Sequence, residues 1–338
     1  MSEKLTPFVK YPGGKGRELK YITPAIPKNI TRYFEPFVGG GAVFFSFDRA
    51  FQFFINDKSK ELITLYNKIQ KRDSQFYTLL NEINTDWKFL EVDKIKIWEN
   101  ENFQKNVVKS LFRKEQFIKK QLYIGNDLSL ENGKALYLTA LKSAYYTTLR
   151  DVYNQNRKAK NFDDNAAYFY FIREFCYSSM FRFSRNGNFN VPYGGMSYNL
   201  KNFDSKLDYI QSPKLLEKLN QTQIYNLDFE IFLNQFDLTE QDFIFLDPPY
   251  DSEFSTYDEN EFGQQEQIRL ANFLKNTSAK WMIVIKDTEF IRSLYPKNNS
   301  NIFYNEFDKK YSVSFMNRNN RQVRHLMITN YQIEEDND

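Results

Sequence analysis

The chain contains only one cysteine and one histidine among its 338 residues. A disulfide needs two cysteines, so none can form within the chain. Zinc sites draw their ligands largely from cysteine and histidine, so a site of that kind is disfavoured. We therefore expect chemistry that needs no metal.

Long apolar runs and a strong charge of one sign are also missing. No segment approaches the roughly 20 apolar residues of a membrane span. The first residues, MSEKLTPFVKYPGGKG, lack the apolar stretch of a signal peptide. Lysine and arginine number 46 and acidic residues 43, a net charge of +3, so any nucleic-acid-binding surface must be local. We expect a soluble, cytoplasmic protein with no membrane partner.

Apolar residues make up 41% of the chain, which is enough for a core, and the length allows one large domain or two modest ones. Strands, glycine turns and helices alternate near both ends, a pattern typical of a mainly parallel sheet. The middle of the chain is polar and helix-like, without strongly apolar strands. The sequence thus predicts an α/β domain formed by residues 1–70 and 214–338, interrupted by a mostly helical insertion at 71–213. The segment 302–331, IFYNEFDKKYSVSFMNRNNRQVRHLMITNY, indicates a terminal strand pair around a basic turn.

A glycine turn, Gly39-Gly40-Gly41, follows a predicted strand and precedes a predicted helix. The dinucleotide fingerprint G-x-G-x-x-G fails, because Phe44 occupies its third glycine position. The turn still allows a ligand to approach the backbone closely. Asp57 ends the next predicted strand, where α/β proteins place the acid that binds a ribose. A turn without a ligand and a helix N-cap are the alternatives, but the combination favours a nucleoside ligand.

A second glycine-rich segment, Tyr11-Pro-Gly-Gly-Lys-Gly16, is similar to a phosphate-binding loop only in part. That loop needs a glycine where this chain has Val9 and a serine or threonine where it has Gly16. ATP hydrolysis is therefore disfavoured.

The segment Ile244–Tyr250, IFLDPPY, is an apolar strand that ends abruptly at Asp247. Two prolines stiffen the backbone that follows it. An exocyclic amine on an aromatic ring is a poor nucleophile, and two fixed acceptors for its N–H groups would activate it. The Asp247 carboxylate and the Pro248 carbonyl can supply them, and the Tyr250 ring can stack on the base. A base inside a duplex must first be flipped out. The alternative is a turn that merely ends a strand.

Together these motifs resemble the Dam-type DNA adenine-N6 methyltransferases of the D12 class, in the α order of motifs. The resemblance runs nearly end to end and rests on six segments: FVKYPGGKGREL, FEPFVGGGAVFF, INDKSKELITLYN, NLDF, NGNFNVPYGG and DPPY. It implies a Rossmann-like methyltransferase fold, S-adenosylmethionine as methyl donor, and double-stranded DNA as substrate.

By residue, the resemblance implies one set for the donor and one for the target adenine. The donor set comprises Tyr11, Lys15, Gly39, Gly40, Gly41, Asp57, Asp228, Phe229 and Asp247, and the catalytic set comprises Asp247, Pro248 and Tyr250. The family often has tryptophan where this chain has Tyr11, which keeps an aromatic face.

DNA contacts are expected from the insertion and from two other places. Lys10 matches a family position that reaches the base before the target adenine, and arginines on the insertion can contact guanine or phosphate. The predicted basic turn near the C-terminus suits the phosphate backbone. The expected DNA-binding residues are Lys10, Tyr177, Arg182, Arg185, Asn190, Pro192, Arg318, Arg321 and Arg324. Taken alone, an arginine such as Arg182 or Arg185 is more often a solvated charge, and the family resemblance is what favours recognition.

Two other classes remain open. One is an RNA or protein-amide methyltransferase of the same fold; such enzymes more often have asparagine where Asp247 stands and lack the NFNVPYG segment. The other is a non-catalytic DNA-binding relative. A restriction endonuclease encoded nearby is a candidate partner, whereas the recognition sequence and the oligomeric state are not specified by the sequence.

Overall fold

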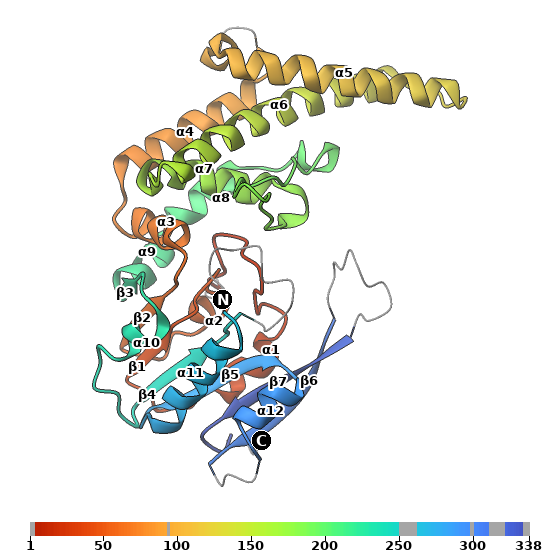
Figure 1. Ribbon diagram of the computed structural model, residues 1–338. Helices are drawn as coiled ribbons and strands as arrows, with labels where there is room; N and C mark the ends of the chain where they lie inside the picture. The colour runs from red at the N-terminus through yellow and green to blue at the C-terminus, as the bar shows by residue number, and fades with distance from the viewer. Residues whose placement is uncertain (1–3, 93–94, 250–261, 298–300, 311–321, 334–338) are drawn as a thin grey trace. The chain divides into compact units, whose positions relative to one another are not determined.

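The computed structural model describes residues 4–92, 95–249, 262–297, 301–310 and 322–333 (Figure 1). The chain divides into two compact units. The sheet unit contains Met1–Pro7, Gly13–Ile63 and Glu217–Asp338, and the helical unit contains Phe8–Pro12 and Thr64–Leu216. The predicted boundaries, 1–70 and 214–338 against 71–213, stay a prediction, because a compact unit need not fold independently.

The sheet unit is built on seven strands in the order β3-β2-β1-β4-β5-β7-β6 (Figure 1). The first five in this order are parallel to one another, whereas β7 is antiparallel to both β5 and β6. The bounds are β1 Arg32–Glu35, β2 Gln52–Asn56, β3 Thr222–Tyr225, β4 Asp242–Leu246, β5 Lys280–Lys286, β6 Phe303–Lys310 and β7 Gln322–Thr329. From β1 the chain continues to β2 and β3 on one side, and later to β4 and β5 on the other. Such a switch point is where open α/β sheets bind ligands.

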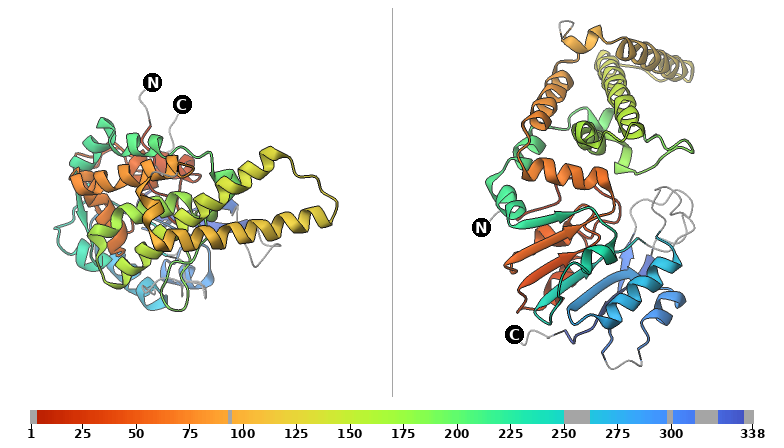
Figure 2. Two further views of the ribbon diagram at one scale, coloured as in Figure 1. Left: turned by 90° about the horizontal axis from the view of Figure 1, so that it is seen from above. Right: turned by 60° about the vertical axis from the view of Figure 1, so that its left-hand side comes forward.

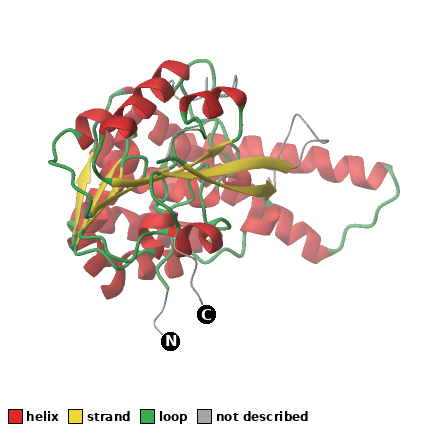
Figure 3. Cartoon of the chain, turned by 90° about the horizontal axis from the view of Figure 1, so that it is seen from below, coloured by secondary structure: helices red, strands yellow, loops and turns green. Residues whose placement is uncertain are grey.

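Helices cover both faces of this sheet, whose strands are drawn in yellow in Figure 3. Alternate strand residues, Phe34 and Ile244 among them, pack in one buried cluster with residues of α10, α11 and α12. The residues between them point to the opposite face, where Phe53 contacts Phe44 of α2. Burial on both faces explains the continuous apolar runs of the parallel strands. The helices are α1 Leu19–Ala25, α2 Ala42–Ser46, α3 Lys60–Gln70, α9 Pro213–Asn220, α10 Phe229–Leu233, α11 Gln264–Asn276 and α12 Glu289–Leu294; α3 and α9 cross the unit boundary.

The helical unit contains long helices (Figure 2). Aromatic side chains are buried in its core. The Trp87 ring lies 4.5 Å from that of Phe175 and 5.3 Å from that of Phe171, centroid to centroid. Asp73 and Asn100 cap two of the helices by accepting hydrogen bonds from backbone N–H groups of the first turn. The helices are α4 Ser74–Phe89, η1 Lys96–Glu99, α5 Glu101–Tyr123, α6 Leu130–Lys158, α7 Phe162–Phe175, η2 Tyr177–Ser179, η3 Met196–Tyr198 and α8 Asp204–Ile210. Among the residues that the structure describes, no helix is both long and apolar enough to cross a membrane.

Candidate active site and DNA-recognition segment

Four of the predicted site positions follow the carboxyl ends of neighbouring parallel strands. The glycine turn follows β1, Asp57 follows β2, Asp228 comes after β3, and Asp247 follows β4 directly. The strand register pairs Glu35 with Ile55, and Asn56 with Tyr225, so these ends lie at one edge of the sheet. The sheet therefore gathers the glycine turn and three carboxylates around its switch point.

Asp57 fixes the glycine turn to the end of the neighbouring strand. Its carboxylate accepts hydrogen bonds from the backbone N–H of Gly39 (3.0 Å) and of Ser59 (2.9 Å). Gly39 and Gly41 have φ values of +50° and +76°, in the region that L-residues rarely occupy. Ser59, rather than Asp57, precedes α3, and its hydroxyl accepts a hydrogen bond from Leu62 N–H (3.4 Å). Asp57 thus supports the turn, and the helix-cap alternative does not hold.

The ends of β1, β2 and β3 are joined by Asn56, which sequence analysis missed. Its side chain is 1% exposed, and its amide donates to the carbonyls of Pro36 and Leu227 (3.0 Å each). Its carbonyl oxygen accepts from Leu227 N–H (2.8 Å). The sequence around Asn56 does not predict this role, because its hydrogen-bond partners lie 20 and 171 residues away along the chain.

Asp228 and Phe229, the predicted adenine-binding pair, begin α10. The Asp228 carboxylate caps this helix by accepting from Glu230 N–H (3.0 Å), and it forms an ion pair with Arg269 of α11. The Phe229 ring is buried, with the Arg269 guanidinium 4.6 Å from its centroid. Both residues therefore have structural partners at the edge of the sheet, and their contact with a ligand stays a prediction.

Lys15 and Asp247, which the family resemblance places together at the donor site, are ion-paired. The Lys15 side chain is 2% exposed and that of Asp247 17% exposed. The Lys15 ammonium also donates to the Gly13 carbonyl (3.1 Å). The structure thus brings the lysine of the N-terminal motif to the carboxylate that the sequence predicts to be catalytic.

The prolines after Asp247 are held by Gln267, a fully buried residue of α11. Its amide donates to the Pro249 carbonyl (3.0 Å), next to the Pro248 carbonyl expected to act as the second acceptor. Sequence analysis missed Gln267, although a glutamine on the buried face of an amphipathic helix is an unusual feature. Tyr250, the predicted stacking residue, lies outside the described residues.

Glu35, the last residue of β1, is a buried acid close to this site. The Tyr33 hydroxyl donates to its carboxylate (2.6 Å). Burial raises the pKa of Glu35 to about 8, and the negative charge of Asp247 adds to this rise, while the Tyr33 hydrogen bond and the nearby Lys218 oppose it. Burial also lowers the pKa of Lys218 to about 7. Two groups whose pKa values lie near neutrality, Glu35 and Lys218, therefore interact electrostatically next to β1.

In the helical unit, the residues that follow α7 form an irregular antiparallel segment. Bridges join Cys176 to Tyr193 and Phe183 to Phe189. Within it, Arg182 Nε donates to the Asn190 side chain (2.8 Å). Most predicted DNA contacts of this segment are exposed: Tyr177, Arg182, Arg185 and Pro192, with Asn190 half-buried.

The remaining predicted residues lie in three places. Lys10 is exposed in the helical unit, and Tyr11 in the same unit places its ring 5.4 Å from that of Phe181. Arg324 was expected on a turn but lies within β7, where it is 60% exposed and 3.5 Å from the Glu306 carboxylate. Arg318 and Arg321 lie outside the described residues.

The seven-stranded α/β sheet and its polar edge match a Rossmann-like methyltransferase fold. The sequence profile of the D12 class N6 adenine-specific DNA methyltransferases matches residues 11–315, so the chain belongs to this family. Accordingly, it is an enzyme that methylates N6 of adenine in DNA.

Several proteins similar to this chain are named Type II methyltransferases or DNA adenine methylases. It is 29% identical to the Type II methyltransferase M.CviBI of Paramecium bursaria Chlorella virus NC1A, over 97% of this chain and 100% of that protein. It is 29% identical to the Type II methyltransferase M.MjaIII of Methanocaldococcus jannaschii, over 86% of this chain and 88% of that protein. It is 24% identical to a DNA adenine methylase of Haemophilus influenzae, over 86% of this chain and 83% of that protein.

Proposed function

We propose that this methyltransferase uses S-adenosylmethionine as methyl donor and acts on adenine in double-stranded DNA, flipping the base into a pocket at Asp247. The observation that supports this most is the pairing of Asp247 with the buried Lys15, at the carboxyl end of β4. An ion-paired carboxylate offers hydrogen-bond acceptors only, as an amine with two N–H groups requires.

The residues around the switch point fit such a donor. Its ribose carries two hydroxyl donors, and a carboxylate has about four lone-pair sites, so Asp57 can bind them while it holds Gly39. The left-handed glycines of the turn leave backbone accessible to the amino-acid half of the donor. Asp228 and Phe229 begin α10 beside them and offer a polar group and an aromatic ring for the adenine half.

When bound, the donor would supply an electrophilic methyl group and leave as S-adenosylhomocysteine, while the methylated amine releases one proton to solvent. The role of the protein is to orient the target amine, which attacks this methyl group. We propose that the Asp247 carboxylate and the Pro248 carbonyl accept the two N–H groups of N6, while Tyr250 stacks on the base. Because both acceptors are fixed before the reaction, little reorganisation opposes the developing charge on nitrogen.

DNA binding is assigned to Lys10 and to the segment Tyr177–Gly195. Their exposed cations suit phosphates and guanine edges, and Tyr177 projects an exposed aromatic ring. A cognate restriction endonuclease is proposed as a partner on the strength of two relatives named Type II methyltransferases.

Methyl-transfer assays with a labelled donor can test the substrate. Equal concentrations of adenine-containing duplex DNA, single-stranded DNA, RNA and protein should yield label in the duplex, at adenine N6. Preferential label in RNA or protein would favour the alternative methyltransferase classes. Donor binding without transfer to any of the four substrates would favour the non-catalytic relative.

A further inference from the structure

Arg173, at the end of α7, is 1% exposed and binds the backbone at three places. Its guanidinium donates to the carbonyls of Lys10 (2.9 and 3.3 Å), Ser179 (2.8 Å) and Met180 (2.6 Å). A guanidinium carries five N–H donors in one rigid plane, so a single side chain can satisfy several acceptors in fixed directions. Arg173 therefore joins the N-terminal segment containing Lys10 to the loop that follows α7.

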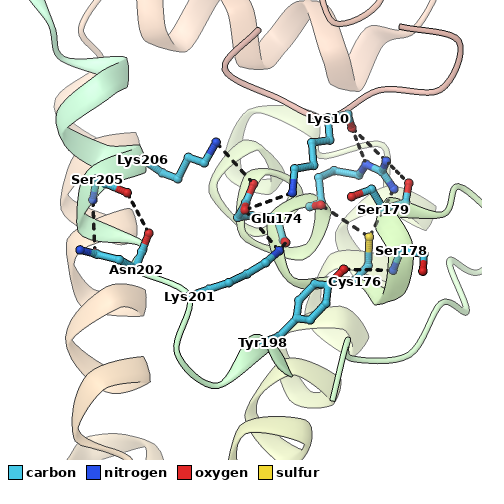
Figure 4. Close-up of polar contacts among 11 residues, drawn as sticks. Lys10, Glu174, Cys176, Ser178, Ser179, Tyr198, Lys201, Asn202, Ser205 and Lys206 are labelled. Carbon is cyan, nitrogen blue, oxygen red and sulfur yellow. Dashed lines mark hydrogen bonds and ion pairs between the residues drawn. The ribbon is translucent and has the colours of Figure 1, made fainter. Parts of the chain in front are cut away.

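Glu174, the next residue, holds the side chain of Lys10. Its carboxylate lies 3.5 Å from the Lys10 ammonium and also neighbours Lys201 (3.4 Å) and Lys206 (3.9 Å), as Figure 4 shows. The Glu174 side chain is 9% exposed, whereas that of Lys10 is 46% exposed. An ammonium has three donors, so Lys10 can keep this ion pair and still contact an acceptor on DNA.

The loop that Arg173 holds has an unfavourable backbone. Ser178 and Ser179 have φ values of +51° and +53°, which is uncommon for residues other than glycine. Such a backbone persists only where its surroundings hold it. Arg173 binds the carbonyls of Ser179 and Met180, and Ser178 N–H donates to the Tyr198 hydroxyl (3.2 Å). Tyr177 is thereby presented from a fixed loop.

We propose that Arg173 and Glu174 are positioning residues that set the enzyme's selectivity for the base before the target adenine. Arg173 fixes the main chain of Lys10 in register with residues 177–180, and Glu174 fixes its ammonium. This inference rests on the proposed function, in which Lys10 binds DNA, and on the family resemblance, which implies that Lys10 reaches that base. Burying an arginine costs desolvation free energy, and apolar side chains of similar volume often stabilise a core as well or better. A role in positioning, rather than in stability, is consistent with this cost.

The test compares Arg173→Lys with Arg32→Lys as a matched control. Arg32 also makes several hydrogen bonds, to the Asp242 carboxylate (2.6 and 2.7 Å) and the Asp237 carbonyl (2.8 Å), but at the amino ends of β1 and β4. The measurement is kcat/KM on four duplexes that differ only in the base before the adenine. Thermal unfolding of each variant monitors the fold.

Lysine cannot span three carbonyls in the arginine's geometry, so Arg173→Lys should lose selectivity between the four bases by about tenfold, the scale of one base contact. Arg32→Lys should keep wild-type selectivity. Glu174→Gln keeps the shape of the side chain but not its charge, and should lose selectivity several-fold. This variant provides the test if Arg173→Lys does not fold. Wild-type selectivity in Glu174→Gln and in folded Arg173→Lys would overturn the proposal.

A double mutant separates positioning from general structural damage. In a Lys10→Ala background, Arg173→Lys should reduce selectivity no further, because its effect passes through Lys10. Additive losses would contradict the proposal, and so would a flatter salt dependence of DNA binding, since that would show Arg173 itself contacting phosphate. If Lys10→Ala alone keeps full selectivity, the proposed role of Lys10 fails as well. If Lys10→Ala loses selectivity but Arg173→Lys and Glu174→Gln keep it, the positioning role is refuted and the role of Lys10 stands.

Discussion

The buried ammonium of Lys15 is ion-paired with the carboxylate of Asp247 at the carboxyl end of β4. The two residues lie 232 positions apart in the sequence, so the pairing depends on the folded sheet unit. The family resemblance implies a donor contact for Lys15. The ion pair predicts a second role, which is to orient the proposed catalytic acceptor Asp247.

Replacing Lys15 with methionine should therefore lower the rate of methyl transfer itself. The change keeps an unbranched side chain but leaves Asp247 without its cation, so the carboxylate is less firmly oriented. By analogy with the loss of one preorganised group, we expect single-turnover rates to fall roughly a hundredfold. An unchanged rate at saturating donor and DNA would contradict the orienting role.

Gln267→Leu should reduce turnover more than DNA affinity. The variant removes the hydrogen bond to the Pro249 carbonyl and so loosens the backbone beside the second acceptor. Leaving a carbonyl unsatisfied costs about 1–3 kcal/mol, so the free energy of unfolding should also fall. Rapid-quench rates and DNA titrations measure the two effects. Gln104→Leu is a control, since Gln104 also donates to a backbone carbonyl, that of Trp98 in the helical unit.

The buried acid Glu35 predicts a pH-dependent difference between the wild type and Glu35→Gln. The folded-state pKa of about 8 lies above the ordinary 4.5, so the folded wild type keeps a proton that the unfolded chain releases between these values. The free energy of unfolding of the wild type should thus fall, relative to the variant, as pH rises from about 5 to 8. Lys218, whose pKa is lowered to about 7, acts in the opposite direction but is present in both proteins.

Denaturant titrations at several pH values give this difference directly. Its full change should be on the order of a few kcal/mol. A difference that stays constant from pH 5 to pH 9 would show that Glu35 does not carry its proton through this range.

Elements with local patterns could be predicted from the sequence, whereas contacts between distant residues could not. The parallel strands inside the sheet contain short apolar runs followed by a glycine turn or an acid, so the sheet and its polar edge were predictable. Other contacts join backbone carbonyls to side chains distant in the sequence, those of Asn56, Gln267 and Arg173. No sequence spacing predicts such contacts. The N-terminal motif is continuous in the sequence, yet Phe8–Pro12 belong to the helical unit and Lys15 belongs to the sheet unit.

Catalysis should not require a divalent ion. Orientation by Asp247 and Pro248 needs acceptors rather than a Lewis acid. Activity should therefore survive dialysis against a strong chelator. Loss of activity that one specific divalent ion restores would refute this prediction, provided that DNA binding is unchanged by the chelator.

The role of Asp247 is tested most directly by Asp247→Ala in a single-turnover assay that quantifies N6-methyladenine in duplex DNA. Donor and DNA binding, measured separately by calorimetry and titration, should partly survive. The rate should fall about a hundredfold or more, because one of two fixed acceptors for the amine is gone. A rate near that of the wild type would contradict activation of the target amine by Asp247.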